Sequence, residues 1–286
     1  MLLVLVASIV AADTAPYRYS WETPIPVEFV ASARKSIERR LKHADLNAET
    51  LNVDTAGVEL ALRPGFFDFL FKKKTPSALD LSTLLAPRGD LQFMRVVPVL
   101  EAPPSIPAFQ ETWRIGGKVL THWVPQAAQP EVLCRWVSQT EASENARWLV
   151  GKERDHWVAR AVRDSGLTGS DVAHATASFD EMSQPTVQVS FTRRGTTRFA
   201  ELTAELVGGK LAIVVDGELV TAPVVQQAIT GGQAQIAFGG MTGGRKSAEA
   251  LAAAVSTSPL PSRLIPAPGL PRPKPAFANR CATVEP

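Results

Sequence analysis

The side chains that most often do chemistry in proteins are few in this sequence of 286 residues, and they are scattered along it. It contains four histidines and two cysteines. His122 and His156 have no spacing to each other, or to a pair of carboxylates, that is typical of a metal site. Cys134 and Cys281 stand too far apart in the sequence for a structural zinc module. We therefore expect no metal site and no cofactor.

Two carboxylates that lie near each other in the sequence, Asp171 and Asp180, are the candidates for paired acid–base catalysis. No recognised arrangement of nucleophile and base surrounds them to complete a catalytic set. Ser170, Ser178 and Ser190 lack the strand–turn–helix context of a nucleophile elbow. The sequence therefore predicts a protein without enzymatic activity.

The charge balance excludes a further class of function. Lys and Arg total 30 against 28 Asp and Glu, so the formal net charge is +2. Proteins that bind nucleic acid through its phosphates carry a strongly basic face, and this composition gives no reason to expect one. Hydrophobic residues make up 45% of the chain, enough for packed cores, and the length corresponds to about two domains.

The first residues predict export. Residues 1–12 are apolar except Ser8, they are too few to span a bilayer, and Val10-Ala11-Ala12 resembles a signal-peptide cleavage site. We expect residues 1–12 to be a signal peptide and the protein to be periplasmic or otherwise exported. A buried first strand is the alternative, because no basic residue precedes the apolar run. No later stretch is long and apolar enough to cross a membrane, so we expect no membrane-spanning segment in the mature chain.

Residues 26–98 alternate strand and helix signals. Apolar residues at helical spacing predict two helices, and short apolar runs predict four strands. The order strand, helix, strand, strand, helix, strand is that of the split βαβ, or ferredoxin-like, fold. The predicted elements are a strand at 26–30, a helix at 33–44, strands at 51–53 and 58–62, a helix at 77–86 and a strand at 91–97.

Residues 99–165 form a tryptophan-rich connecting segment. We expect the tryptophans to lie in a core; a groove that holds a ligand is the alternative. Residues 132–137 predict a strand, and the stripe around Trp157 fits either a helix or a strand. Cys134 can pair with Cys281 in an exported protein, or both can be free thiols. The prolines of residues 259–286 predict an extended tail.

Residues 166–258 predict a second α+β module. Thr186–Phe191 alternates as a strand, and a helix follows with an apolar stripe. Asp216-Gly217 stands between two apolar runs, which is the strongest short-range signal for a hairpin with a primed turn. A strand at 234–238 and an alanine-rich helix at 247–255 close the module. The overall fold class is therefore α+β.

This second module resembles the head subdomain of the first periplasmic region of SecD, a protein-export membrane protein. Several motifs occur in the family's order over about 90 residues, and residues 26–98 resemble the family's base subdomain more weakly. The residues that carry the resemblance are Leu167, Thr168, Gly169, Asp171, Phe179, Asp180, Phe199, Leu202, Thr203, Asp216, Gly217, Ala222, Pro223, Thr230, Gly231 and Gly232. We expect them to be mainly structural, in turns and in the core.

The resemblance implies a protein-export role by non-enzymatic binding, with unfolded or translocating polypeptide or components of the Sec translocon as partners. It does not extend to the family's membrane domain, so proton-driven energy coupling is not implied. An open sheet edge can bind extended polypeptide through its backbone, but the sequence does not show which edge is open. The alternative is a structural or adaptor protein of the cell envelope that keeps the fold without an export role.

Overall fold

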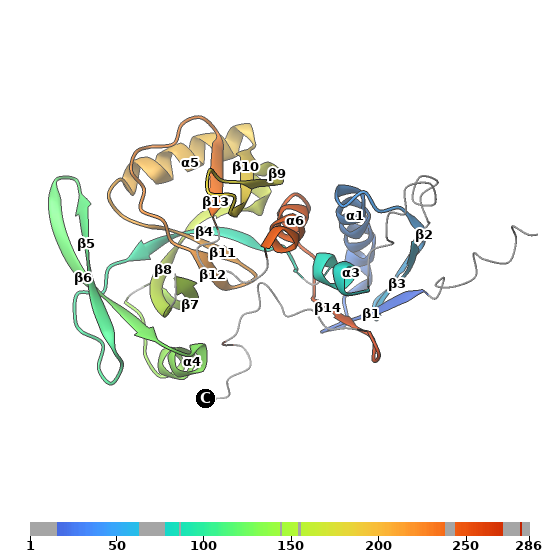
Figure 1. Ribbon diagram of the computed structural model, residues 1–286, viewed down its shortest axis with the longest axis horizontal. Coiled ribbons are helices and arrows are strands. Elements are labelled where there is room, and N and C mark those ends of the chain that lie inside the picture. The colour runs from blue at the N-terminus through green and yellow to red at the C-terminus, as the bar shows by residue number, and fades with distance from the viewer. Residues whose placement is uncertain are drawn as a thin grey trace, which may run out of the picture.

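The computed structural model describes residues 16–62, 78–85, 87–143, 145–153, 156–237, 244–270 and 281, and these form two lobes side by side along the long axis (Figure 1). The base lobe combines residues from the first part of the chain with one strand from near its end. Its elements are β1 (Tyr17–Trp21), α1 (Val27–His43), β2 (Ala48–Val53), β3 (Gly57–Leu62), α3 (Ala78–Leu85) and β14 (Leu264–Pro266).

The base lobe is one antiparallel sheet in the order β14-β1-β3-β2, with α1 and α3 packed on it. The β2–β3 hairpin forms because the Asp54 carboxylate accepts hydrogen bonds from the N–H groups of Ala56 and Gly57, at 2.7 and 2.8 Å. Ile37 of α1 and Leu60 of β3 are fully buried in the shared core. Each such side chain contributes about 1.5–3 kcal/mol by leaving water.

The predicted boundaries of this module need three corrections. Residues 26–30 are not a strand, because α1 begins directly after Pro26, and Val27 and Phe29 are exposed on its first turn. The first strand is β1, and the fourth is β14, from the predicted tail. The predicted strand 91–97 exists, but it belongs to the other lobe.

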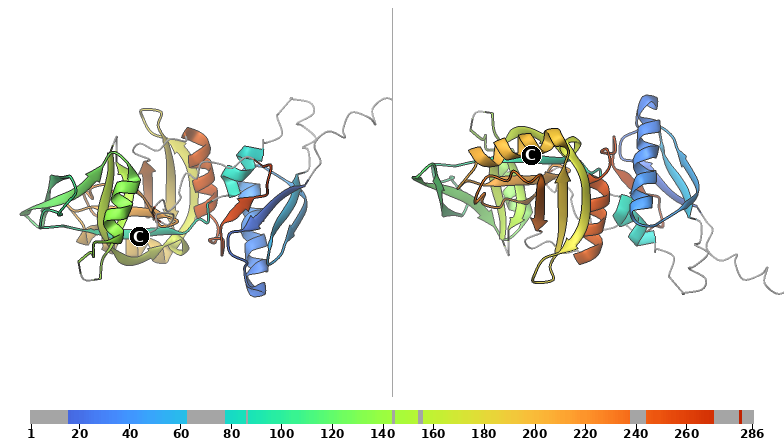
Figure 2. Two further views of the ribbon diagram at one scale, coloured as in Figure 1. Left: turned by 90° about the horizontal axis from the view of Figure 1, so that it is seen from below. Right: turned by 90° about the horizontal axis from the view of Figure 1, so that it is seen from above.

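The head lobe contains a closed ring of five strands, β4-β11-β12-β7-β8, which closes because β4 also pairs with β8. The β5–β6 hairpin joins this ring where β6 pairs with β8, and it extends outward at one end of the molecule (Figures 1 and 2). The strands are β4 (Leu91–Val97), β5 (Ala108–Ile115), β6 (Lys118–Ala127), β7 (Arg147–Glu153), β8 (His156–Thr168), β11 (Leu211–Val215) and β12 (Glu218–Thr221).

A three-stranded antiparallel sheet, β13-β10-β9, completes the head lobe. Helix α6 lies between this sheet and α3 of the base lobe, and Figure 2 shows it at the junction. Its alanines explain this position: Ala252 packs in the head core and Ala253 in the base core, so small side chains are needed on both faces. The remaining elements are α4 (Pro130–Ser138), η1 (Gly169–Asp171), β9 (Val172–Phe179), β10 (Pro185–Phe191), α5 (Arg193–Glu205), β13 (Gln233–Ala237) and α6 (Gly244–Val255).

The tryptophan-rich segment forms part of the head lobe. The predicted strand at 132–137 is wrong: these residues lie in α4, which begins at Pro130, a residue favoured in the first turn of a helix. Trp157 lies in a strand, β8. Trp113 is buried, which agrees with the core interpretation, and Trp136, Trp148 and Trp157 are half-buried against a further cluster under α4.

The chain ends differ from the predictions in one respect. Residues 264–266 are not a free tail, because they pair with β1 as the edge strand β14, where a proline is tolerated. Cys134 and Cys281 form a disulfide, which links the C-terminal segment to α4. The predicted signal peptide 1–12 lies outside the described residues. Within the described part, no helix is long and apolar enough to span a membrane.

Candidate functional site

Strand β9 has one edge outside the sheet, because it is the end strand of β13-β10-β9. Its register pairs Ala175 with Val189 and Ala177 with Val187 of β10. In an antiparallel pair, successive residues point their N–H and C=O groups alternately toward the partner strand and away from it. Ala175 and Ala177, two residues apart, therefore point their backbone groups the same way.

This edge of β9 is blocked at Ala175. The hydroxyl of Ser256, directly after α6, accepts a hydrogen bond from the Ala175 N–H and donates one to its C=O, both at 3.0 Å. The Nε2 atom of His43, the last residue of α1, lies 3.2 Å from the same carbonyl oxygen. These contacts establish that the N–H and C=O of Ala175 face away from β10. Both groups already have hydrogen-bond partners, so they are not available to another strand.

The next position along the same edge is open. By the alternation of the strand, the N–H and C=O of Ala177 also face away from β10, and within the described part of the chain neither has a hydrogen-bond partner. Unpaired groups at a strand edge are a template for a further strand. Ala177 is therefore the place where another chain can pair with β9.

A cavity of about 540 Å³ opens beside Ala177, between the two lobes. We call it the edge cavity. Its wall includes the apolar residues Leu84, Ala250 and Ala253, so an apolar side chain fits against it. The residues around it are His43, Ala44, Asp45, Leu46, Thr83, Leu84, Thr176, Ala177, Glu249, Ala250 and Ala253. The volume lies within the range of about 300–1,000 Å³ found for ligand pockets.

The end of α1 shapes one wall of the edge cavity. Asp45 adopts a left-handed conformation, with φ of 57°, just after the helix. The N–H of Leu46 then bonds the C=O of Leu41, and the N–H of Asp45 bonds the C=O of Lys42, at 2.8 and 3.1 Å. This is a Schellman motif, which reverses the chain.

A clamp on residues 87–90 fixes the lobes, and hence the edge cavity, relative to each other. From the base lobe, the guanidinium of Arg40 donates to the carbonyl oxygens of Pro87 and Arg88. From the head lobe, the carboxylate of Asp216 accepts the N–H groups of Arg88, Gly89 and Asp90 at 2.8, 3.0 and 3.0 Å. The connecting backbone is thus held from both sides.

Burial dominates the electrostatics of this clamp. It lowers the pKa of Arg40 to about 10, although the charge of Asp216 opposes the shift. Burial raises the pKa of Asp216, and the backbone hydrogen bonds of Asp90 and Arg88 work against that rise. The charges of Arg263 and Arg40 also lower the pKa of Asp216, so the buried carboxylate is stabilised by two cations as well as by the backbone.

A network of ion pairs lies elsewhere in the head lobe. The Arg160 guanidinium binds Glu153 and, at 2.7 Å, Glu111, and Lys210 Nζ lies 2.6 Å from Glu111. His122 Nε2 lies 3.2 Å from a carboxylate oxygen of Glu111. Burial alone would raise the pKa of Glu111, but His122, Arg160 and Lys210 outweigh it and hold this pKa well below the usual carboxyl range. Burial opposes the charge of Arg160 too, but its carboxylate partners raise its pKa.

The two candidate acids are not brought together. Asp171 is buried at one end of β9, where it binds Arg198 at 3.0 Å and forms a capping box with Thr168. Asp180 follows the other end of β9, and its carboxylate accepts the N–H groups of Met182 and Gln184. Both acids therefore stabilise local backbone.

Most of the other residues predicted from the motifs are structural. Leu167, Phe199 and Leu202 are buried in the head core. The hydroxyl of Thr203 accepts the N–H of Ile229 and donates to the C=O of Phe199.

The predicted turns are also present. Asp216 and Gly217 have φ of 53° and 82°, which confirms a primed turn between β11 and β12. Gly232 has φ of 69°. Gly169 lies in η1, and Thr230 and Gly231 lie between β12 and β13.

Of the remaining motif residues, one is exposed at the end of a strand and two line a cavity. Phe179 ends β9 and is exposed near the open edge. Ala222 and Pro223 line a second cavity, beside Lys210.

Comparison with known proteins identifies the head lobe. Residues 146–262 match the family model "SecDF, P1 head subdomain". These residues are therefore similar to the SecDF P1 head subdomain. Among curated relatives, the protein translocase subunit SecDF of Thermus thermophilus is 53% identical over 70 residues, which are 24% of this chain and 10% of the relative. The subunit SecD of Acidaminococcus fermentans is 44% identical over 100 residues, 34% of this chain and 23% of the relative.

The likeness in fold extends over both lobes. A solved structure described as "Structure and function of a membrane component SecDF that enhances protein export" aligns with a TM-score of 0.52 at 24% identity, covering 88% of this chain and 98% of that one. This confirms the α+β architecture and the resemblance to the SecD periplasmic region. The chain spans less than a quarter of the length of the curated relatives described above.

Sequence reasoning missed the residues that define the edge site. Ser256, His43 and Ala177 belong to three separate segments, and no spacing in the sequence links them. The neighbouring Phe179 and Asp180 were recognised, but only for their resemblance to the family. Which backbone groups of β9 are unpaired depends on its register with β10, and this register is not evident from the sequence.

Proposed function

We propose that this chain binds extended segments of polypeptide during protein export, that it does so in the periplasm or an equivalent exported compartment, and that it is not an enzyme. The observation that carries the proposal is the open backbone of Ala177 beside the edge cavity. The match of residues 146–262 to the SecDF P1 head subdomain, and the likeness to protein translocase subunits, support it. Partners are then translocating polypeptide or the translocation machinery; the adaptor alternative has no observation in its favour.

Binding proceeds by strand addition. An incoming chain pairs with the N–H and C=O of Ala177, and one of its alternate side chains enters the edge cavity. Two backbone hydrogen bonds contribute about 0.5–1.5 kcal/mol each, and one buried apolar side chain about 1.5–3 kcal/mol. The sum of about 2.5–6 kcal/mol corresponds to dissociation constants of about 40 μM or weaker. Backbone pairing makes the binding tolerant of sequence and nearly independent of salt.

A proline substitution at the open edge tests the proposal. Ala177→Pro removes the free N–H without breaking a hydrogen bond of the sheet, because that group faces away from β10. The matched control is Ala237→Pro at the opposite edge of the same sheet. Ala237 pairs with Thr186, whose backbone groups face β9, so its own N–H also faces outward.

The assay is fluorescence anisotropy of a labelled, unstructured peptide titrated with the full chain at two salt concentrations. We expect Ala177→Pro to weaken binding by up to about tenfold, as the loss of one hydrogen bond of about 0.5–1.5 kcal/mol implies, and Ala237→Pro to bind like the wild type. Two peptides, N-methylated at the odd or at the even residues, should differ in affinity. The one whose methyl groups replace the N–H groups that face β9 should bind poorly. Equal affinities of the two proline variants would contradict pairing at β9, and no binding by the wild type near millimolar protein would defeat the function.

A further inference from the structure

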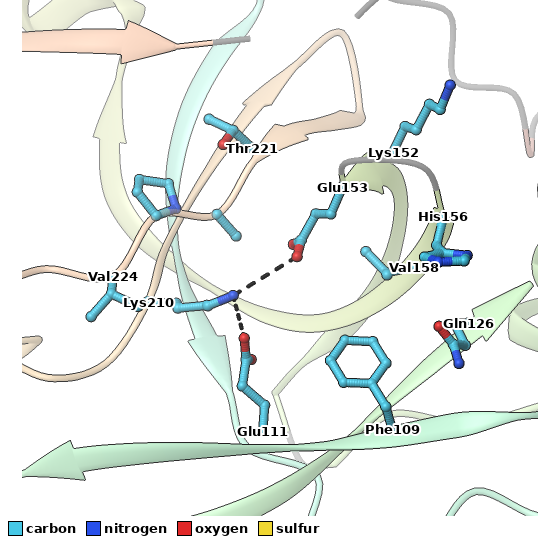
Figure 3. Close-up of a pocket in the computed structure, with 12 residues that line it drawn as sticks. Phe109, Glu111, Gln126, Lys152, Glu153, His156, Val158, Lys210, Thr221 and Val224 are labelled. Atoms are coloured by element: carbon cyan, nitrogen blue, oxygen red, sulfur yellow. Dashed lines mark ion pairs between the residues drawn. The ribbon is translucent and has the colours of Figure 1, made fainter. Parts of the chain in front are cut away.

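A second cavity lies in the head lobe, and we call it the ion-pair cavity. Its volume is about 580 Å³. Figure 3 shows Phe109 and Glu111 of β5 pointing into it from one side, with Lys210 at the wall. Val158 and Val224 add further apolar surface. It shares no lining residue with the edge cavity.

Lys210 has donor capacity that the described residues do not use. An ammonium group carries three N–H donors. Its Nζ lies 2.6 Å from Glu111, whereas the distance of 3.8 Å to Glu153 is too long for a hydrogen bond. The side chain is 9% exposed, so water satisfies the remaining donors poorly. A ligand that offers an acceptor here gains a hydrogen bond that the empty cavity lacks.

The charges around the cavity select a neutral acceptor. Glu111 and Glu153 are balanced by Lys210 and Arg160, and the two carboxylates are occupied by the N–H groups of Arg160. The two carboxylates would repel an anionic ligand. The ammonium group of Lys210 would repel a cationic one. Lys152 stands at the outer rim, where solvent screens its charge (Figure 3).

We infer that the ion-pair cavity binds an uncharged peptide unit that carries an apolar side chain. The peptide carbonyl accepts a hydrogen bond from Lys210 Nζ, and the side chain packs against Phe109, Val158 and Val224. No net charge is transferred into the cavity, so binding does not depend on salt. This site is independent of strand addition at Ala177, because neither position contributes to the other cavity.

The test uses three probes that share one side chain and differ in charge. N-acetyl-leucinamide is neutral, N-acetyl-leucine is an anion and leucinamide is a cation. We would titrate each into the full chain and follow backbone amide shifts by NMR. The neutral probe should bind at least tenfold more tightly than either charged probe, and the largest shifts should lie at the cavity rather than at β9.

Three variants locate the site. Val224→Asp places a charge on the apolar wall, and Lys210→Met removes the donor at nearly constant length; each should weaken binding of the neutral probe at least tenfold. Val119→Asp changes an exposed valine, 65% accessible and away from both cavities, and should have no effect. If Lys210→Met does not fold, the three probes of different charge and the Val224→Asp variant still test the inference. Equal binding of the anion, or unchanged binding by Val224→Asp, would overturn the inference. Loss of N-acetyl-leucinamide binding in Ala177→Pro would do so too.

Discussion

Replacing Asp216 by asparagine tests the clamp that holds the two lobes. Asparagine keeps one side-chain oxygen, which can still accept the N–H groups of Gly89 and Asp90, both at 3.0 Å. Its amide NH₂ faces the Arg88 N–H, which loses an acceptor at 2.8 Å. A hydrogen bond to a charged acceptor contributes about 1.5–3 kcal/mol, and the buried Arg40 also loses an opposite charge. We expect Asp216→Asn to lower the free energy of unfolding by about 2–4 kcal/mol and Asp216→Ala by about 3–5 kcal/mol.

The assay is urea denaturation followed by both tryptophan fluorescence and far-UV circular dichroism. Asp54→Asn is the matched control. Asp54 also accepts two backbone N–H groups in a hairpin turn, but it is exposed, and asparagine can form the same turn. Asp54→Asn should lower the free energy of unfolding by less than about 1 kcal/mol. An Asp216→Asn midpoint that matches the control, with unchanged slope, would refute the reasoning that the clamp is energetically important.

Further predictions concern a turn, the ion-pair network and the blocked edge. Gly217→Val should lower stability by about 1–3 kcal/mol, because φ is 82° there; an unchanged melting temperature would count against it. Glu111 has a pKa below its usual 4.5, so its stabilising contribution is present above that pH and is lost as pH falls. The stability difference between wild type and Glu111→Gln should therefore shrink from about pH 7 to about pH 3 in parallel denaturation series; a constant difference would be inconsistent with this. Ser256→Ala frees the N–H of Ala175, so long peptides should gain affinity relative to short ones in anisotropy titrations, and equal gains would argue against a blocked edge.

Local signals predicted local structure well. The Asp216-Gly217 turn was predicted because two residues with positive φ suffice to define it. The 26–30 segment was mistaken for a strand because a short apolar run has no period long enough to separate strand from helix. Val27 and Phe29 are exposed on the first turn of α1, and only the structure shows this.

Pairing between distant segments could not be predicted. Strand β14 pairs with β1 across almost the whole chain, and Leu260 is buried in the core just before it. A truncation at Pro259, which the sequence suggests as a clean removal of the tail, would therefore delete part of the base lobe. The edge site has the same origin, because His43 and Ser256 meet at Ala175 only after both lobes have folded.

Hydrogen exchange at a single amide tests the central claim most directly. The N–H of Ala177 has no partner among the described residues, so it should exchange rapidly in the free protein. On addition of a saturating unstructured peptide, its exchange should slow markedly, while the Ala175 N–H, already bonded to Ser256, should change little. Binding of the peptide with no protection at Ala177, and protection at another strand edge instead, would contradict the account.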